Sequence, residues 1–402
     1  MKTKYGLSPD VKFCIKCTMS NQRPVPVGET QFKKGAKKKT DIFDESGICA
    51  ACKFAEIKED KIDWDKREEE LIKLCDRHRS KNNSTYDCII PGSGGKDSRF
   101  TSHILKHKYG MNPLTVTWAP HIYTDIGKSN HTTWNNDCDN LLVTPSIDTH
   151  RKLTRFAFTN LLHPFQPFVL GQRYTALRIA KKFGINLVFH GESPFEYGST
   201  NPLKDSKKNG FDKEYFVTKQ DKSQIFLGGV SVKDLVQKHK ISLSELFWYL
   251  PIFNSDLRGF KLDYKFLGYY LRWNPQEVFY YAVDKTGFVP NPERTEGTYS
   301  KYASLDDRID GFHYYTSFIK YGLGRATMDS AQEIRNGLLT RDEGVSLVKK
   351  YDGEFPSKYF KEILSYMDIT EKQFWTHINA ARSPHLWKKK NNTWTLMHKV
   401  WK

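Results

Sequence analysis

Glycine and hydroxyl residues are concentrated in one short segment that follows an apolar run and precedes a helical stretch: Ser93-Gly94-Gly95-Lys96-Asp97-Ser98. Glycine lets the backbone approach an anion closely, and successive N–H groups at a helix N-terminus, which carries about half a positive charge, can point at that anion. Ser93 and Ser98 add hydroxyl donors. The spacing differs from the phosphate loop of GTPase-like proteins and from the dinucleotide pattern of dehydrogenases. The segment predicts another kind of phosphate-binding loop, and a Gly-Ser turn without a ligand is its alternative.

The same segment resembles the PP-loop of the N-type ATP pyrophosphatases. Enzymes of that superfamily hold the pyrophosphate of ATP in this loop. They transfer AMP onto a substrate oxygen, which a nitrogen or sulfur nucleophile then displaces. The resemblance therefore implies an ATP site here.

Four of the seven cysteines form two pairs with the same spacing: Cys14, Cys17, Cys49 and Cys52. Thiolates separated by two residues on a tight turn can face one ion, and two such pairs complete the tetrahedral sulfur shell of structural zinc. We therefore expect a zinc knuckle, with unligated thiols and an iron–sulfur cluster as the alternatives. No open coordination position is implied, so the expected role is to fold this segment. The isolated cysteines are interpreted as small buried apolar residues: Cys75, Cys88 and Cys138.

The chain of 402 residues carries 63 Lys and Arg against 46 Asp and Glu, a net charge of +17. This balance favours an anionic partner: nucleic acid, an anionic membrane surface or phosphorylated metabolites. No segment approaches the roughly 20 apolar residues of a membrane span, and no apolar stretch follows the first charged residues. We expect a cytoplasmic protein whose membrane association, if any, is peripheral.

Apolar runs alternate with segments long enough for crossover helices, which predicts an α/β fold with a doubly wound parallel sheet. An amphipathic helix is expected over residues 64–79, and another over residues 172–183. The proline-bracketed residues 163–168 are expected to line a cavity or to pack in the core. The expected strands are Cys88 to Pro91, Leu114 to Trp118, Leu141 to Thr144 and Asn186 to His190.

Ligands of such sheets bind beyond the carboxyl ends of the strands. After the second expected strand, the Trp118 ring and the backbone of residues 117–121 are candidates for holding adenine. Glu192 and Glu196 follow the fourth. Magnesium prefers carboxylate and phosphate oxygens together, so both are candidate magnesium ligands. A surface charge or a helix cap is the alternative for each.

The second half of the chain is expected to be mostly helical. A lysine-rich stretch over residues 199–222 is expected to be a mobile loop or lid, and a further strand is expected over residues 266–273. Gly287 is expected to end a helix. Helix-start signals stand at three places: Asn274-Pro275, Thr340 with Glu343, and Thr370 with Gln373.

Aromatic, basic and acidic residues are dense in the poorly periodic residues 296–313. Such a density indicates a site more than a solvated loop. Adenylyl transfer needs a basic group aimed at the transferring phosphate, because negative charge spreads on that phosphate in the transition state. Lys301 and Arg325 are the candidates, and a structural ion pair is the alternative for each.

The assembled pattern resembles the N-acetyl sugar amidotransferases of bacterial surface polysaccharide pathways. Residues 191–192 and 325–335 also resemble, distantly, the ATP site of asparagine synthetases, and the chain departs from them at Phe195, where they carry an acidic residue. The likeness to the amidotransferases is carried by the two cysteine pairs and by these segments: residues 91–98, 117–121, 163–168, 191–192 with 196–198, and 291–302.

The resemblance implies an ATP-dependent enzyme that converts the acetamido group of a nucleotide- or lipid-linked sugar into an acetamidino group. It implies ATP, Mg²⁺ and Zn²⁺ as cofactors. The implied organisation is a four-cysteine zinc knuckle (1–60), an adenine nucleotide alpha hydrolase-like PP-loop domain (61–200) and a helical substrate or partner region (201–402). The candidate catalytic residues are Asp97, Glu192, Lys301 and Arg325, and residues 93–98 with Trp118 are the candidate ATP contacts.

Such enzymes usually receive ammonia from a glutaminase, because ammonia is mostly protonated at neutral pH. No isolated cysteine sits in a Gly-x-Cys-x-Gly nucleophile turn, so a partner glutaminase is implied, with a cyclase-like barrel subunit as a candidate conduit. No nucleic-acid partner is expected. Two alternatives stay open: a tRNA-modifying thiolase, which also combines a PP-loop, cysteine knuckles and a basic surface, and a catalytically silent scaffold for a glutaminase.

Overall fold

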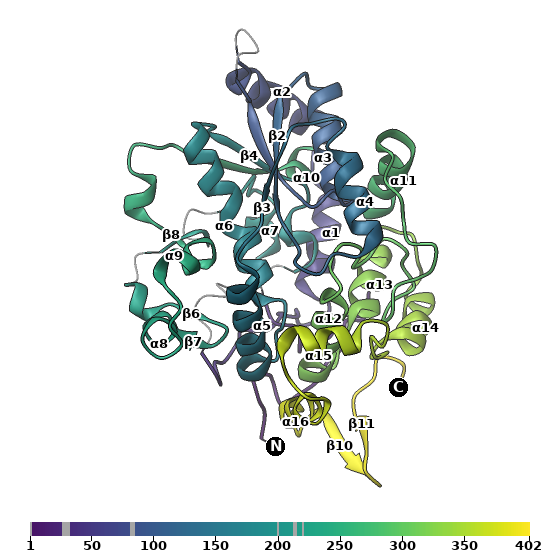
Figure 1. The fold of residues 1–402 in the computed structure, drawn as a ribbon. Helices are drawn as coiled ribbons and strands as arrows, with labels where there is room; N and C mark the ends of the chain where they lie inside the picture. The colour runs from purple at the N-terminus through teal and green to yellow at the C-terminus, as the bar shows by residue number, and fades with distance from the viewer. Residues whose placement is uncertain (1, 26–32, 81–84, 199–200, 212–214, 219–220) are drawn as a thin grey trace.

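A five-stranded parallel sheet forms the centre of the computed structural model, which describes residues 2–25, 33–80, 85–198, 201–211, 215–218 and 221–402. The strand order is β3-β2-β1-β4-β9, in the upper half of Figure 1. The four predicted strands are confirmed. The strands are β1 (Cys88–Pro91), β2 (Pro113–Trp118), β3 (Asn140–Val143), β4 (Leu187–His190) and β9 (Asp263–Phe266).

Helices surround the sheet and make up most of the chain after it. The helices up to β9 are α1 (Ala50–Asp60), α2 (Trp64–His78), α3 (Lys96–His107), α4 (Asp125–Trp134), α5 (Ile147–Leu161), α6 (Gln166–Phe183), α7 (Pro202–Asp205), α8 (Val232–Gln237) and α9 (Leu243–Leu246). Those after β9 are α10 (Leu267–Tyr270), α11 (Pro275–Thr286), α12 (Asp310–Tyr321), α13 (Arg325–Arg335), α14 (Arg341–Tyr351), α15 (Phe360–Met367) and α16 (Glu371–Ala381).

Short strands form three two-stranded sheets outside the central one. One is a hairpin close to the C-terminus. These strands are β5 (Val217–Thr218) with β8 (Ile252–Phe253), β6 (Phe226–Leu227) with β7 (Val230–Ser231), and β10 (Trp387–Lys390) with β11 (Thr393–Leu396).

Successive residues of each strand face opposite sides of the sheet, as the two-residue period of a strand requires. Cys88 and Ile90 of β1 pack with apolar residues of α2, α3 and α10 on one face. Ile89 packs with α5, α6 and α8 on the other. Both faces are therefore covered, which explains why the strands read as continuous apolar runs.

Local start and stop signals place several helices as predicted. The Asp63 side chain accepts a hydrogen bond from the N–H of Lys66 at the start of α2. Asn274 caps α11 in the same way, and Gly287, with φ of 66°, ends it. Each cap stabilises its helix by about 0.5–2 kcal/mol. Two predicted capping boxes are present: Thr340 with Glu343 and Thr370 with Gln373.

Two predicted element boundaries are wrong. α6 begins at Gln166 and not near residue 172, because Pro167 occupies the first turn, where no N–H is required of it. The strand expected over residues 266–273 ends at Phe266, and the next apolar residues form α10. There the Leu271 N–H donates to the Leu267 carbonyl at 2.9 Å, which closes a helical turn.

The described part of the predicted lid is not a free loop. α7 lies within it and packs on α1, and the carbonyl of Ser206 accepts a hydrogen bond from Arg67 at 3.0 Å. Residues 199–200, 212–214 and 219–220 of the predicted lid lie outside the described residues.

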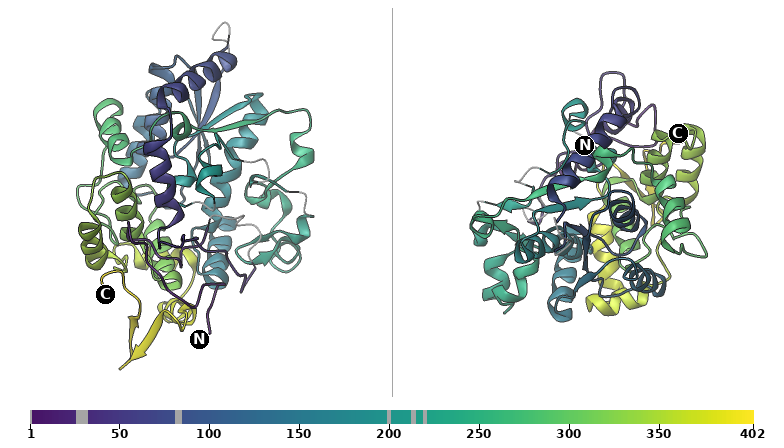
Figure 2. Two further views of the ribbon diagram at one scale, coloured as in Figure 1. Left: turned by 180° about the vertical axis from the view of Figure 1, so that it is seen from behind. Right: turned by 90° about the horizontal axis from the view of Figure 1, so that it is seen from above.

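The N-terminal segment and the C-terminal helices share one apolar core. Leu7 and Cys14 belong to the same buried cluster as Phe312 of α12 and Phe374 of α16. Figure 2 (left) shows the purple N-terminal segment crossing the back of the molecule beside these helices. The fifth strand, β9, also lies beyond the expected domain boundary at residue 200. Within the described ranges, no helix has the length and apolar content needed to cross a membrane.

Candidate active site

The strand order of the sheet reverses between β1 and β4. Ligands of doubly wound sheets bind at such a point, beyond the carboxyl ends of the strands. A cavity of about 230 Å³ lies there, lined by Gly92 after β1, by His190 and Glu192 at the end of β4, and by the aromatic rings of Tyr215 and Tyr264. Gly92, which precedes the predicted phosphate loop, and Glu192, one of the two candidate magnesium ligands, therefore line the same cavity.

The loop between β1 and α3 has the shape of an anion-binding turn. Gly94 has φ of 83°, and a Cβ there would lie 2.9 Å from the Cα of His131. Glycine is therefore required on both conformational and steric grounds. Gly95 is the N-cap of α3 and supplies no side-chain cap. The first N–H groups of α3 are thus available to a phosphate, which fits the predicted ATP site.

Arg99 holds this loop in place from inside the protein. Its Nε donates to the Gly94 carbonyl at 2.9 Å, and its Nη atoms donate to the carbonyls of Asn130 and Thr286. Burial lowers the pKa of Arg99 to about 10, so the side chain stays cationic at neutral pH. Sequence reasoning missed this residue. The sequence did offer one signal for Arg99, because it stands in the first turn of the helix that follows the loop.

Lys96 and Asp97 join the loop to the polar segment predicted to be part of a site. The Lys96 Nζ lies 2.6 Å from Asp97 Oδ1 and 5.3 Å from the centre of the Tyr302 ring. In the same segment, the Tyr299 hydroxyl donates to Glu333 of α13 at 2.8 Å. The segment therefore connects the loop to α13.

Glu192 is the carboxylate that the structure places beside the loop. The Tyr197 hydroxyl donates to its Oε2. Burial first, and the negative charge of Asp97 second, raise the pKa of Glu192 to about 7, while Lys96 and Arg325 act in the opposite direction. The charges of Asp97, Lys96 and Arg325 thus all act on Glu192, and we call these four residues the central cluster.

Arg325 enters this cluster from the first turn of α13. Its Nε donates to Asp329 Oδ1 at 2.8 Å, and its guanidinium carbon lies 4.4 Å from the centre of the Tyr314 ring. The helix start is held by Asp352, which accepts hydrogen bonds from the N–H groups of Gly324 and Thr327 at 2.8 and 3.1 Å. The guanidinium is therefore held in a defined position.

The raised pKa of Glu192 predicts a specific pH dependence of stability. The folded state binds this proton more tightly than the unfolded chain, whose ordinary pKa is 4.5. Ionisation of Glu192 therefore destabilises the folded state. The free energy of unfolding is expected to fall as pH rises from 4.5 through about 7. We expect Glu192→Gln to become progressively more stable than the wild type over this range, by less than about 1.4 kcal/mol per pH unit for one proton.

Urea unfolding at a series of pH values measures this difference. Glu371→Gln, at an exposed position on α16, is the control and is expected to show no pH-dependent difference. A constant difference between Glu192→Gln and the wild type across the series contradicts the prediction.

Three other predicted site residues lie outside the central cluster. Lys301 is exposed, and its Nζ donates to the Pro292 carbonyl at 2.9 Å. Trp118 is 3% exposed and packs so tightly on α6 that a Cβ on Gly171 would lie 2.0 Å from its ring. Glu196 is buried, and its carboxylate lies 3.1 Å from the Lys58 Nζ. A role for any of them at the phosphate loop stays a prediction.

The four paired cysteines come together as a compact buried cluster. Their sulfur atoms all lie within 4.8 Å of one another. The Cys14–Cys52 and Cys17–Cys49 sulfur distances are both 3.8 Å. A tetrahedral shell with Zn–S bonds of about 2.3 Å requires sulfur separations of about 3.8 Å. The donor set and its spacing therefore fit zinc, which would cross-link the two N-terminal turns.

This cysteine knuckle docks on α13, the helix that carries Arg325. The Thr18 hydroxyl donates to the Thr327 carbonyl at 3.1 Å. At the other end of α13, the Arg335 Nη1 lies 4.0 Å from Cys17 Sγ. The helix that follows the knuckle, α1, reaches the end of α13 as well, through Lys58 and Asn336 at 3.3 Å. These contacts were not predicted from the sequence, because they join residues that are far apart along the chain.

The comparisons with known proteins bear on the C-terminal part of the chain. Residues 296–401, less than half of the chain, match the family described as "LPS biosynthesis protein WbpG-like, C-terminal domain". No curated protein matches the chain. The solved NMN synthetase of Francisella tularensis aligns with 69% of this chain and 94% of its own, at 12% identity. The TM-score of this alignment is 0.29. The region that contributes Tyr302 and Arg325 is thus similar to the C-terminal domain of WbpG-like proteins.

Proposed function

We propose that this protein is an ATP-dependent, AMP-forming amidotransferase that converts the acetamido group of a carrier-linked sugar into an acetamidino group during surface polysaccharide biosynthesis. The observation that carries the proposal is the contact between the phosphate loop and the region similar to WbpG-like proteins, where the Lys96 Nζ lies 5.3 Å from the centre of the Tyr302 ring. The same region is named for lipopolysaccharide biosynthesis.

The proposed reaction has two steps. The amide oxygen of the acetamido group attacks the α-phosphorus of ATP, and the bond to pyrophosphate breaks. Ammonia then adds to the activated carbon, and the bond from carbon to the AMP oxygen breaks, leaving the amidine, AMP and pyrophosphate. Adenylation is needed because an amide oxygen is a poor leaving group.

We assign residues of the loop and of the central cluster to the groups that carry charge in this reaction. The N–H groups of residues 94–97 and the Lys96 ammonium bind the departing pyrophosphate. The Arg325 guanidinium, fixed by Asp329, stabilises the negative charge that spreads on the transferring phosphate. Asp97 and Glu192 are the carboxylates that would hold Mg²⁺, which neutralises phosphate charge when bound.

The ammonia source is proposed to be a separate glutaminase. The purified chain is then expected to use ammonium salts and to be inactive with glutamine alone. Robust glutamine-dependent product formation by the pure chain contradicts this part of the proposal.

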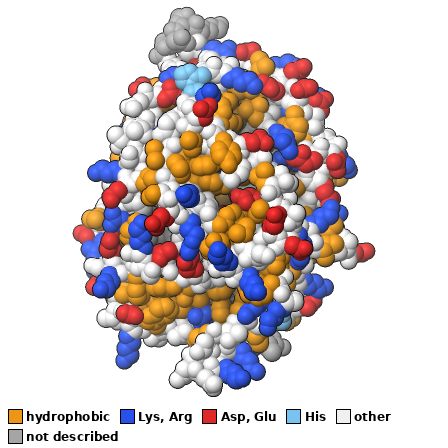
Figure 3. All heavy atoms as spheres, turned by 90° about the vertical axis from the view of Figure 1, so that its right-hand side faces the viewer, with side chains coloured by type: hydrophobic (Ala, Val, Ile, Leu, Met, Phe, Trp, Pro, Cys, Tyr) orange, Lys and Arg blue, Asp and Glu red, His pale blue; other side chains and the backbone are white. Residues whose placement is uncertain are grey.

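A tRNA thiolase is the alternative that the same loop allows. Thiolation usually needs a reactive cysteine near the loop, and a thiolate is the reactive form. Burial raises the pKa of Cys75 and of Cys138 to about 12, and raises that of Cys88 as well. On the face drawn in Figure 3, basic and acidic side chains are interspersed among hydrophobic ones. These observations favour the sugar amidotransferase.

The experiment that tests the proposal measures AMP and pyrophosphate release by the purified chain with ATP, magnesium and ammonium. A panel of acetamido-sugar nucleotides and bulk tRNA serve as acceptors. We expect release that requires a sugar, together with a product in which mass spectrometry shows NH in place of O. Release that requires tRNA overturns the proposal, and glutaminase binding without any AMP release favours the scaffold alternative.

A further inference from the structure

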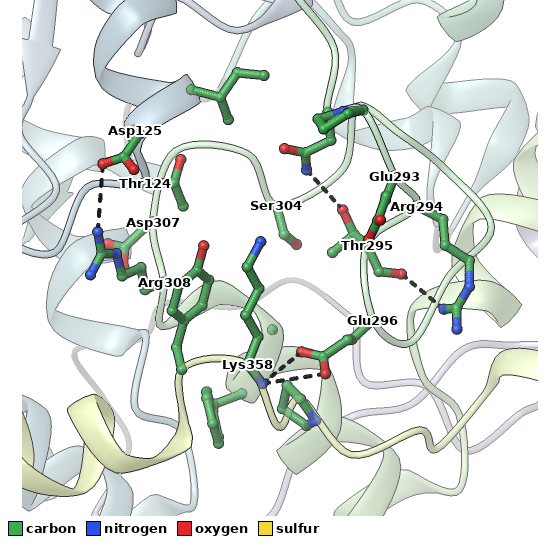
Figure 4. A pocket seen from close by; sticks show the side chains of 17 residues that line it. Thr124, Asp125, Glu293, Arg294, Thr295, Glu296, Ser304, Asp307, Arg308 and Lys358 are labelled. Carbon is green, nitrogen blue, oxygen red and sulfur yellow. Dashed lines mark hydrogen bonds and ion pairs between the residues drawn. The ribbon is translucent and has the colours of Figure 1, made fainter.

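A second and larger cavity, of about 550 Å³, lies outside the phosphate loop. It is bounded by the N-terminal ends of α4 and α12, by residues 291–296 and by residues 356–359 (Figure 4). Its volume lies in the range of small-molecule sites. Six of its seventeen lining residues belong to the polar residues 296–313, which were predicted to form a site.

Most charged groups around this cavity already have partners. Arg294 donates to both carboxylate oxygens of Glu354, at 2.6 and 2.8 Å. The Glu296 carboxylate accepts hydrogen bonds from the N–H groups of Ser357 and Lys358, at 3.0 and 3.2 Å. The contacts of Glu296 join residues 291–296 to residues 356–359, so these two parts of the cavity wall are fixed to each other.

The Lys358 ammonium differs from these groups. Figure 4 shows its side chain leaving the backbone beside Glu296 and pointing into the cavity, toward Ser304. Its Nζ lies 5.3 Å from the centre of the Tyr359 ring. Among the described residues, no carboxylate forms an ion pair with it. A cation presented in this way is suited to an anionic group of a ligand, and the adjacent aromatic ring is suited to the apolar face of a sugar.

Two chains of side-chain contacts lead from this cavity toward the central cluster. The hydroxyl of Ser304, which lines the cavity, donates to Asp310 at 2.5 Å. Asp310 in turn interacts electrostatically with Arg325. Ile126, another lining residue, packs in the same small cluster as Tyr302, whose ring faces Lys96. The cavity is thus connected to the central cluster through Ser304 and Asp310, and through Ile126 and Tyr302.

We propose that this cavity binds the sugar substrate, and that Lys358 binds the anionic group of that substrate. This inference rests on the proposed function for the identity of the ligand. The anionic group is either a carboxylate on the sugar or the diphosphate of a nucleotide carrier. Both present negatively charged oxygens to the Lys358 ammonium, so the site is assigned to an anionic group of either kind.

Isothermal titration calorimetry at about 0.15 M salt, which screens distant charges, tests the assignment. The probes are UDP-N-acetylglucosamine, UDP-glucuronic acid and free N-acetylglucosamine. We expect Lys358→Glu to weaken the binding of at least one UDP-sugar by more than about tenfold, or about 1.4 kcal/mol. Lys361→Glu, at an exposed position three residues away, is the matched control and is expected to change affinity less than about twofold.

The two sources of negative charge give different patterns. If Lys358 binds the diphosphate, Lys358→Glu weakens both UDP-sugars equally. If it binds a sugar carboxylate, only UDP-glucuronic acid is weakened. ATP affinity, measured in parallel, is expected to be unchanged in both variants.

The inference is overturned if neither UDP-sugar binds the wild type, or if Lys358→Glu and Lys361→Glu lose the same affinity for the UDP-sugars. It is also overturned if Lys358→Glu weakens ATP binding as much as it weakens UDP-sugar binding. Its failure is distinguishable from failure of the proposed function. Lys358-dependent binding without AMP release leaves the cavity assignment standing, whereas sugar-dependent AMP release that is unaffected in Lys358→Glu removes only the cavity assignment.

Discussion

Replacing Arg325 with methionine is expected to slow sugar-dependent AMP formation by about 10²–10³-fold, the loss typical of removing one preorganised group that stabilises transition-state charge. Arg325 reaches the central cluster from α13 and is held by Asp329. The loss is expected in kcat more than in the KM for ATP, because charge spreads on the transferring phosphate only in the transition state. Steady-state kinetics with saturating ammonium measure both constants.

Two further variants show whether the effect is chemical or structural. Arg325→Lys keeps the charge and is expected to recover part of the rate, although lysine lacks the planar fork of arginine. Arg155→Met removes a surface ion pair with Asp368 and is expected to leave the rate unchanged. If folded Arg325→Met keeps the wild-type kcat, or if its loss of rate appears only as a raised KM for ATP, the assigned role is wrong.

Removing one cysteine of the knuckle is expected to destabilise the protein by more than about 4 kcal/mol, because loss of a structural metal is among the few changes that exceed this size. The wild type is expected to carry one zinc per chain. The knuckle cysteines belong to the apolar core shared with the C-terminal helices, so the damage is expected to spread beyond the N-terminus. Urea unfolding of Cys52→Ala and metal analysis measure these effects.

Cys138→Ala is the matched control, since it removes the same atom from another buried cysteine and is expected to cost far less. Activity is expected to fall together with zinc content, because Thr18 and Arg335 connect the knuckle to the helix that carries Arg325. A wild type without zinc, or equal destabilisation by the two variants, contradicts this account. Visible absorption by the purified protein would identify an iron–sulfur cluster instead.

The strands and helix ends were predictable because their signals are local. An apolar run such as Cys88–Pro91 predicts a buried strand, and an N-cap such as Asn274 predicts a helix start. Residues 266–273 were misread as a strand because a short apolar run satisfies the strand and helix periods equally well. The strand ends at Phe266, where its pairing with β4 ends, and Leu267 begins α10.

The sequence by itself determined the phosphate loop and the cysteine cluster, since each depends on the spacing of neighbouring residues and on the backbone freedom of glycine. Only the tertiary structure decided which distant side chains join them. It placed Arg325 where its charge acts on Glu192, bonded Arg99 to the loop, paired Glu196 with Lys58 and left Lys301 exposed. The physical reason is that the electrostatic partners of a side chain depend on which segments the core packs together, and that packing is a property of the whole chain.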